Sequence, residues 1–288
     1  MKPSPFGWSA PTSLDEALDV LDRVGGEGKV LAGGQSLLPI LNMRLAAPAH
    51  LVDINRLDEL AYVRVVDGTV HVGALARHAA VEKDEAAFGV QPLLRQALRL
   101  VAHPVIRNRG TTVGSLAHAD PSGEMTAVLA LTGGTVQVAS LAGGTRDVDA
   151  ASFFTGPLES CLEAGELAVS AAFPAFAPGS GTVFDEVARR HGDYAVCGLA
   201  AVVTVTDGVV TAARTAHISM GPTPVVLNLT EPVVGSVPGD ADWAAAGELA
   251  VDQLDPEPDI HASADYRRHL GRVLTVRALA EAAGRAVA

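Results

Sequence analysis

The segment at residues 174–181 constrains the fold most, because it divides the chain into two blocks. It reads PAFAPGSG, and its prolines and glycines disfavour a helix or strand that continues across it. A chain of 288 residues is long enough to build one large or two modest hydrophobic cores. We therefore expect two domains, over residues 1–176 and residues 177–288.

The first block alternates helix-like and strand-like pieces. Ser13, with Glu16 three residues later, forms a capping-box pattern that predicts the start of a helix. Residues 29–32 and residues 51–54 are predicted to be short strands, and a helix is predicted to begin at Leu37. Runs of strands beside runs of helices indicate the α+β class.

Two Asp-Gly pairs predict β-hairpins, because this dipeptide suits the tight turn between antiparallel strands. One pair lies in the middle of residues 62–72, and the other lies in the middle of residues 194–218. Helical periodicity marks residues 92–102 and residues 264–284. The second block therefore closes with a long helix that follows a hairpin.

The composition excludes several classes of protein. A formal charge of −12 argues against a nucleic-acid partner, which needs a dense basic face. The two cysteines, Cys161 and Cys197, are too few for a disulfide framework or an iron–sulfur cluster, and we expect both to be buried. The nine histidines are scattered, so we expect no metal site. No apolar run is long enough to span a membrane, and we expect a cytoplasmic protein.

The first stretch with chemical content is Ala32–Leu37. Two glycines directly after a predicted strand allow a sharp turn and a close approach of the backbone to a ligand. Backbone N–H groups at the following helix start can hold phosphate oxygens without any lysine. The alternative is an ordinary turn between a strand and a helix. The spacing is not that of the dinucleotide-binding fingerprint G-x-G-x-x-G.

The second stretch is Arg107–Pro121, which gathers glycines, hydroxyl residues, a histidine and a carboxylate with little apolar periodicity. A buried loop of this composition needs partners for its polar groups, and a ligand can supply them. The alternative is a solvated loop with local Ser, Thr and Asp turns. The composition alone leaves both interpretations open.

Together with Arg189–Ala195 and Asp259–Arg268, these stretches resemble the FAD-binding medium subunits of the molybdenum hydroxylases, the group of carbon monoxide dehydrogenase and xanthine dehydrogenase. The resemblance runs from about residue 6 to residue 280. It implies an FAD-binding domain of the vanillyl-alcohol-oxidase type, followed by a smaller C-terminal domain of a sheet and helices.

The resemblance also implies where FAD would bind. Residues 32–36 would wrap the pyrophosphate and the turn at residues 111–115 would clasp it from the other side. Asp120 and Glu124 would lie near the ribityl and ribose hydroxyls, and Tyr194 against the isoalloxazine ring. The implied cofactor-binding residues are Ala32, Gly33, Gly34, Gln35, Ser36, Leu37, Thr111, Gly114, Ser115, His118, Asp120, Glu124 and Tyr194.

Several of these residues have a second interpretation. No catalytic residue is assigned, and His118 and Tyr194 are the candidates. His118 is either a proton shuttle or a ring that bonds a backbone carbonyl within the turn, and we favour the second. Tyr194 is either the stacking ring or a packed strand residue. Arg107 either offsets a phosphate charge or is exposed.

The sequence departs from the family at two places. The family has a Gly-Gly pair in the second turn where this chain has Val113 before Gly114. A valine adopts positive φ only at a cost, and its side chain would lie where the pyrophosphate is expected. Residues 220–224 also look shortened against a glycine-rich segment of the family.

The resemblance implies an electron-transfer subunit that takes electrons from a 2Fe-2S small subunit, after a molybdenum-cofactor large subunit has oxidised the substrate. The external acceptor would be NAD, a quinone or dioxygen. The alternative is a free-standing FAD-dependent oxidase or dehydrogenase that acts directly on a small organic molecule, which the altered turn at Val113 keeps open. A third hypothesis is a scaffold that has lost its cofactor.

Overall fold

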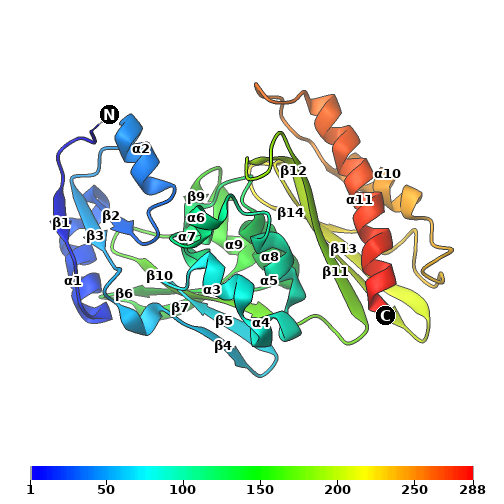
Figure 1. Cartoon of the computed structure of the whole chain (residues 1–288), viewed down its shortest axis with the longest axis horizontal. Helices are drawn as coiled ribbons and strands as arrows, with labels where there is room; N and C mark the ends of the chain where they lie inside the picture. Colours follow the sequence, from blue (N-terminus) through cyan, green and yellow to red (C-terminus); the bar gives the residue numbers. More distant parts are fainter. Residues whose placement is uncertain (1, 288) are drawn as a thin grey trace.

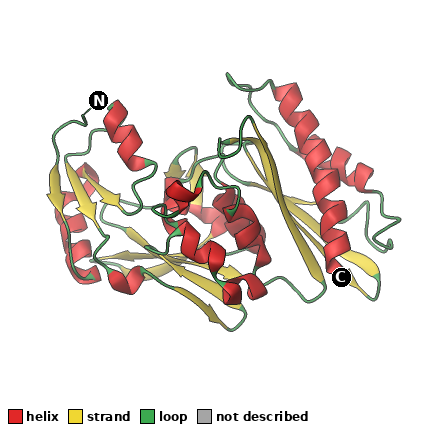
Figure 2. Ribbon diagram, in the orientation of Figure 1, coloured by secondary structure: helices red, strands yellow, loops and turns green. Residues whose placement is uncertain are grey.

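A computed structural model describes residues 2–287 and shows a mixed α+β fold in which three main sheets follow one another along the molecule (Figure 1). In Figure 2, helices lie between the sheets and on the outer face of the last one. The α+β class predicted from the sequence is confirmed. None of the helices within residues 2–287 is long and apolar enough to cross a membrane.

The first sheet is small and parallel, with the order β1 (Gly7–Ser9), β3 (His50–Asp53) and β2 (Gly28–Leu31). Helix α1 (Leu14–Val24) runs from β1 toward β2, and a 3-10 turn, η1 (Gly25–Glu27), follows it. The predicted N-cap is confirmed, because Ser13 Oγ accepts from the Glu16 N–H at 3.2 Å. Helix α2 (Leu37–Met43) starts where the sequence predicts.

The second sheet is antiparallel and has the order β4 (Val63–Val66), β5 (Thr69–Gly73), β10 (Leu167–Pro174), β6 (Thr135–Ser140) and β7 (Gly144–Asp149). The predicted hairpin of β4 and β5 is confirmed, with Asp67 and Gly68 at positive φ in its turn. The other elements of this half are η2 (Asp58–Leu60), α9 (Ala150–Phe153), β8 (Phe154–Gly156) and β9 (Glu159–Ser160).

A group of helices connects β5 to β6. They are α3 (His78–Lys83), α4 (Glu85–Val90), α5 (Pro92–Leu98), α6 (Pro104–Arg107), α7 (Thr112–His118) and α8 (Glu124–Thr132). The predicted helix over residues 92–102 is too long, because α5 ends at Leu98 and Ala102 has φ of 44°. Proline at residue 104 then starts the separate helix α6, where a missing N–H is harmless.

The third sheet contains β11 (Ser180–Ala188), β12 (Ala195–Thr206), β13 (Val209–Ile218) and β14 (Val225–Asn228) in chain order, all antiparallel. Helices α10 (Trp243–Gln253) and α11 (Ala264–Ala286) pack together, and α11 lies along β11 and β12 (Figure 1). Helices α5 and α8 contact the same sheet from the first half of the chain. The hairpin and the final helix predicted for this block are confirmed.

Strand β12 is buried on both faces, so the third sheet separates two hydrophobic cores. Ala200 and Val202 belong to the core of the first half, while Leu199 and Val203 belong to the core beneath α10 and α11. Strand β10 ends in the second sheet before residue 175, and β11 opens the third sheet at Ser180. The breaker-rich segment therefore connects two sheets, and the domain boundary at residue 176 stays a prediction.

Candidate functional site

The two glycine-bearing stretches lie against each other, although they are far apart in the sequence. A Cβ atom on Gly33 would lie 2.6 Å from the Arg109 carbonyl oxygen and 2.7 Å from the Gly110 Cα. No side chain fits in that space, so the backbone itself makes the contact. The site therefore starts at the carboxyl end of β2, in the loop that leads to α2 (Figure 1).

The loop at residues 33–37 presents backbone N–H groups that the protein leaves free. Gly34 has φ of 74°, a conformation that glycine adopts without strain. Within the described residues, the five N–H groups of 33–37 donate to no backbone or side-chain acceptor. Gln35 instead turns its amide back to the Gly33 carbonyl oxygen at 3.1 Å. Clustered free N–H groups at a helix start suit an anion such as a pyrophosphate.

The second stretch is not the turn that the sequence predicts, because Thr112–His118 forms helix α7. Thr111 is its N-cap, and Thr111 Oγ1 accepts from the Gly114 N–H at 3.2 Å. The Thr111 carbonyl oxygen accepts from the Ser115 N–H at 3.0 Å. The Thr112 N–H donates to the Ala76 carbonyl oxygen at 3.3 Å. Most N–H groups of this helix start are therefore already bonded.

Val113 fits this helix without strain, so the positive φ expected from the sequence is not found here. It lies within the helix, is absent from the residues with positive φ, and has only 1% of its surface exposed. Its side chain belongs to the core and faces a small apolar cavity rather than the loop at residues 33–37. A β-branched residue is tolerated in a first helical turn when its side chain packs in the interior.

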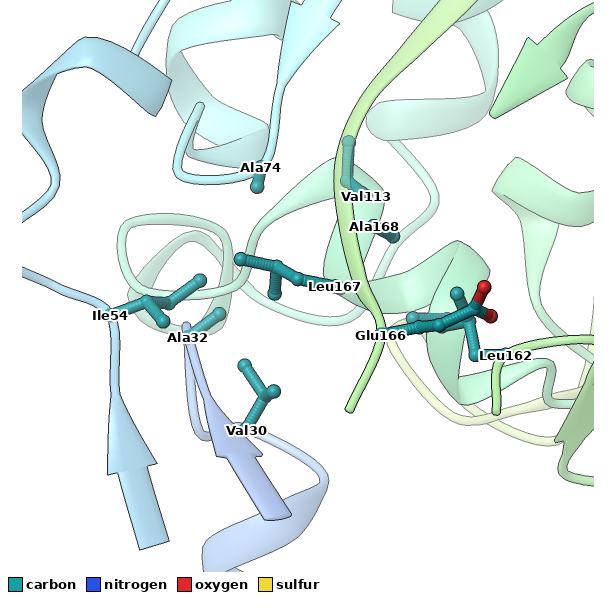
Figure 3. A pocket seen from close by; sticks show the side chains of 11 residues that line it. Val30, Ala32, Ile54, Ala74, Val113, Leu162, Glu166, Leu167 and Ala168 are labelled. Atoms are coloured by element: carbon teal, nitrogen blue, oxygen red, sulfur yellow. The ribbon is translucent and has the colours of Figure 1, made fainter. Parts of the chain in front are cut away.

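The apolar cavity lies where the first sheet meets α7 and β10, and Figure 3 shows its labelled side chains converging from both sides. It has a volume of about 70 Å³. Ala32, which directly precedes the loop at residues 33–37, is part of the cavity wall. The cavity is lined by Val30, Ala32, Ile54, Ala74, Val113, Gly114, Ala117, Leu162, Glu166, Leu167 and Ala168.

Asn55 and Arg77 hold the two stretches together, and neither was predicted from the sequence. Asn55 Nδ2 donates to the Ala32 carbonyl oxygen at 2.9 Å. Arg77 Nη2 donates to Asn55 Oδ1 at 2.7 Å, and Arg77 Nη1 donates to the Arg109 carbonyl oxygen at 2.6 Å. A continuous chain of hydrogen bonds therefore connects the start of the first stretch to the second.

His78 contacts the second stretch through its ring and its backbone, and it was not predicted from the sequence either. Its ring lies 3.0 Å from Ser115 Oγ through Nε2 and 3.2 Å from Thr112 Oγ1 through Nδ1. The His78 N–H donates to the Gly110 carbonyl oxygen at 2.9 Å. Burial, and the nearby charge of Arg107, lower the pKa of His78 to about 4. The ring is therefore neutral at pH 7 and can both donate and accept.

Arg107 has a structural role, and the interpretation of it as an exposed arginine is wrong. The residue is buried, and its Nε donates to Glu82 Oε2 at 2.9 Å. Its Nη1 donates to the Val101 carbonyl oxygen at 2.9 Å. A buried guanidinium needs such partners, and the offset of a phosphate charge by Arg107 stays a prediction.

The predicted acidic residues follow α7 directly. Ala119 has φ of 51° and ends the helix, and Asp120 Oδ1 then accepts from the Ser122 N–H at 2.8 Å. Glu124 is the first residue of α8, and burial, with the neighbouring charge of Asp120, raises its pKa to about 7. Glu186 on β11 has its pKa raised to about 8 by burial and by the charges of Glu124 and Asp185.

Tyr194 lies in the connection just before β12, with 68% of its surface exposed, so it is not a packed strand residue. Burial around its hydroxyl group and the charges of Asp120 and Glu124 raise its pKa. The Tyr194 side chain is largely open to solvent. This arrangement leaves an aromatic face available to a flat ligand.

His118 does not make the backbone hydrogen bond that we favoured. Its Nε2 lies 4.0 Å from Asp120 Oδ2, and in residues 2–287 its ring has no hydrogen-bond partner. The half-buried imidazole is thus beside a carboxylate at the end of α7. Its role as a proton shuttle remains a prediction.

Two family models together match most of the chain. The family model described as the FAD binding domain in molybdopterin dehydrogenase matches residues 4–176. The model described as the CO dehydrogenase flavoprotein C-terminal domain matches residues 182–282. The chain is 41% identical over 288 residues to the 6-hydroxypseudooxynicotine dehydrogenase complex subunit alpha of Paenarthrobacter nicotinovorans, covering 99% of this chain and 97% of that protein.

Solved structures share the fold. Quinoline 2-oxidoreductase from Pseudomonas putida 86 superposes with a TM-score of 0.93 at 38% identity, covering 100% of both chains. Carbon monoxide dehydrogenase from Hydrogenophaga pseudoflava superposes with a TM-score of 0.92 at 34% identity, covering 99% of each chain. These identities and coverages apply to both halves of the molecule together.

Proposed function

The chain belongs to the family of FAD-binding medium subunits of the molybdenum hydroxylases, and we propose that it passes electrons from an iron–sulfur partner to an external acceptor. The observation that carries this proposal is the group of free N–H donors at residues 33–37 in a chain that matches the family along nearly its full length. An FAD-binding domain and dehydrogenase subunits are what the matching models and relatives describe.

The residues present fit FAD. The N–H groups of residues 33–37 would hold the pyrophosphate, with Ser115 and Gly114 beside them. Asp120 and Glu124 would accept hydrogen bonds from sugar or ribityl hydroxyls, since a carboxyl oxygen is a good acceptor. Tyr194 would lie against the isoalloxazine ring through its exposed face.

Bound FAD would supply two-electron redox chemistry that the amino acids lack. The chain itself would bind, orient and shield the flavin. A proton must accompany electrons onto a flavin, and Glu124, with a pKa of about 7, can hold or release one near neutral pH. His118, whose Nε2 lies 4.0 Å from Asp120 Oδ2, and Tyr194 remain the other candidates for that task.

We propose a 2Fe-2S small subunit and a molybdenum-cofactor large subunit as partners. Relatives are named as subunits or medium chains, including caffeine dehydrogenase subunit beta from a Pseudomonas strain at 38% identity. The chain has two cysteines, fewer than the four thiolates that an iron–sulfur cluster of the usual kind requires. Electrons would therefore reach the flavin from a cluster held by another polypeptide.

The alternative, a free-standing FAD enzyme, loses the observation that kept it open. The strain expected at Val113 is absent, because this residue packs inside a regular helix. What separates the two functions is where the organic substrate is oxidised. In the proposed function the flavin receives electrons only through partner subunits.

The test begins with an absorbance spectrum of the purified full-length chain, followed by titration with FAD. A protein that stays colourless and takes up no FAD contradicts both flavin functions. The flavin-loaded chain is then mixed anaerobically with candidate organic substrates, without other subunits. We expect the flavin band to persist until a reduced iron–sulfur partner is added. Bleaching by substrate alone would establish the free-standing enzyme instead.

A further inference from the structure

Arg267 is a buried arginine at the start of α11, and three oxygen atoms from three separate segments surround its guanidinium. Its Nη1 donates to the Val196 carbonyl oxygen at 2.6 Å and to the Ser219 carbonyl oxygen at 2.9 Å. Its Nη2 donates to Asp259 Oδ2 at 2.7 Å. Only 6% of the residue is exposed. Because a buried charge is costly without partners, these contacts fix the guanidinium in one position.

Ser219, one of the residues that Arg267 bonds, connects the third sheet to the first half of the chain. Its N–H donates to the Pro121 carbonyl oxygen at 2.8 Å. Its Oγ donates to the Ala195 carbonyl oxygen at 2.7 Å and lies 2.8 Å from Ser122 Oγ. Ser219 has φ of 60°, an uncommon conformation for a residue other than glycine, and its four hydrogen bonds hold it there.

The hydrogen bonds from Arg267 to Val196 and to Ser219 both connect it to segments that adjoin the candidate flavin site. Val196 and Ala195 are the first residues of β12, directly after Tyr194. Pro121 and Ser122 directly follow Asp120, and the Ser122 N–H donates to Asp120 Oδ1. Arg267 therefore anchors the backbone next to Tyr194 directly, and the backbone next to Asp120 through Ser219. Figure 1 shows the start of α11 beside the end of the third sheet where these segments meet.

We propose that Arg267 is a positioning residue that sets the placement of Tyr194 and Asp120 at the flavin end of the site. The inference rests on the proposed function, because it takes the isoalloxazine ring to lie at Tyr194. Arg267 acts through Val196 and Ser219 and touches no ligand itself. Helix α11 thereby fixes the flavin environment from the opposite side of the third sheet.

Asp259 completes the arrangement from the segment before α11. Its Oδ1 accepts from the His261 N–H at 2.8 Å and from the Ala262 N–H at 2.9 Å, while its Oδ2 accepts from Arg267. An Asp259→Asn variant keeps an acceptor for the turn and removes the negative charge that faces Arg267. It therefore perturbs Arg267 with little direct effect on the fold of the segment.

The neighbouring Arg268 is a matched control. It pairs with Asp255 at 2.8 Å, on the same turn of α11 and toward the same segment as Arg267. Its side chain is 36% exposed and bonds neither β12 nor β13. Arg268→Met thus removes an arginine and its two ion pairs at the same place, without the proposed link to the site.

The experiment compares Arg267→Met, Arg267→Lys and Arg268→Met as FAD-loaded full-length chains. The readouts are the dissociation constant of FAD, the shape of the flavin absorption band and the quenching of flavin fluorescence by a stacked ring. We expect Arg267→Met to weaken FAD binding about tenfold and to relieve quenching, because two charge-assisted hydrogen bonds to the site's backbone are lost. Arg267→Lys should recover part of both effects, and Arg268→Met should match the unmodified chain.

A Tyr194→Leu variant tests the placement of FAD at Tyr194 separately from the role of Arg267. If Tyr194→Leu leaves fluorescence and absorption unchanged, the flavin ring is not at Tyr194 and the proposed placement of FAD fails. If Tyr194→Leu relieves quenching but Arg267→Met does not, the placement stands and the role of Arg267 is overturned. In the Tyr194→Leu background, Arg267→Met should have no further effect on quenching.

Loss of the fold in Arg267→Met would leave Ser219→Ala and Asp259→Asn to decide the question. Ser219→Ala keeps Arg267 and its acceptors but removes the hydroxyl bonds to Ala195 and Ser122. We expect it to relieve quenching with a circular dichroism spectrum like that of the parent and a lower thermal midpoint, because two hydrogen bonds of Ser219 are lost. Unchanged quenching in both of these folded variants would overturn the proposal.

Discussion

The two glycine-bearing stretches of the site both lead into a short helix, yet they treat their backbone N–H groups in opposite ways. Within the described chain, the loop at residues 33–37 leaves its donors without acceptors. The helix start at residues 111–115 bonds most of its own through Thr111 and Ala76. Donors without protein acceptors are available to a ligand, so we infer that the first stretch serves the cofactor and that the second serves the backbone framework that supports it.

Gly33→Ala should break this arrangement most severely, because the added methyl group would overlap the Arg109 carbonyl oxygen and Gly110. If the two stretches move apart, both the free N–H groups of residues 33–37 and the helix start at residues 111–115 are displaced. We expect FAD affinity to fall about 100-fold or more, measured by titration of the flavin spectrum. Gly26→Ala is the matched control, since a Cβ there meets no atom within 4 Å. Equal affinity in the two variants would show that the contact at Gly33 is dispensable.

His78→Ala should lower the stability of the fold more than the affinity for FAD. It removes the partner of Thr112 and Ser115, whose hydroxyl groups would then be poorly satisfied. We expect the free energy of unfolding to fall by about 2–4 kcal/mol, by urea denaturation, with a smaller loss of FAD affinity. An unchanged stability would mean that the contacts of this ring contribute nothing to the second stretch.

The same residue gives the framework a dependence on pH. The pKa of His78 falls from 6.5 to about 4 on folding, so the folded protein binds fewer protons than the unfolded chain between these values. Stability is therefore fully present above pH 6.5 and is lost as the pH falls through this window, by at most about 3 kcal/mol. His78→Gln should reduce that slope, and a slope equal to the parent's would assign it to other groups.

The first stretch could be predicted from the sequence because its signals are local. Gly33 and Gly34 follow a strand directly, and the fold of Ala32–Leu37 matches the expected strand, turn and helix start. The second stretch could not be predicted in the same way. Thr111 has Gly114 three residues later instead of the Glu or Gln of a capping box, so the start of α7 carries no clear sequence signal.

The supporting residues were missed for a different physical reason. Asn55, Arg77 and His78 act through partners that are 22 to 37 positions away in the chain, and folding alone brings them together. Asn55 does follow the predicted strand at residues 51–54 directly, a position where functional side chains gather, and this signal could have found it. For Arg77 and His78 the sequence offers no comparable pattern.

Val113→Ala tests whether the valine belongs to the framework alone. The loss of buried methyl groups should reduce the free energy of unfolding by about 1–2 kcal/mol, since the side chain is in the core and borders the apolar cavity. FAD affinity should stay within about threefold of the parent, because helix α7 keeps its geometry. A gain in affinity, measured by the same flavin titration, would revive the idea that valine obstructs the pyrophosphate.

Thr111→Ala should have the smallest effect and yet sharpen the contrast most. Loss of an N-cap oxygen lowers the free energy of unfolding by about 1 kcal/mol. It also frees the Gly114 N–H, which donates to Thr111 Oγ1 in the unmodified protein. If that N–H then reaches the cofactor, FAD affinity should hold steady or rise slightly while the thermal midpoint falls. Thr111→Ser keeps the oxygen and should match the parent in both measurements. If FAD affinity and stability both fall in Thr111→Ala and not in Thr111→Ser, the opposite conclusion follows. The helix start at residues 111–115 would then bind the ligand in the unmodified protein, with Thr111 Oγ1 orienting its N–H groups toward FAD.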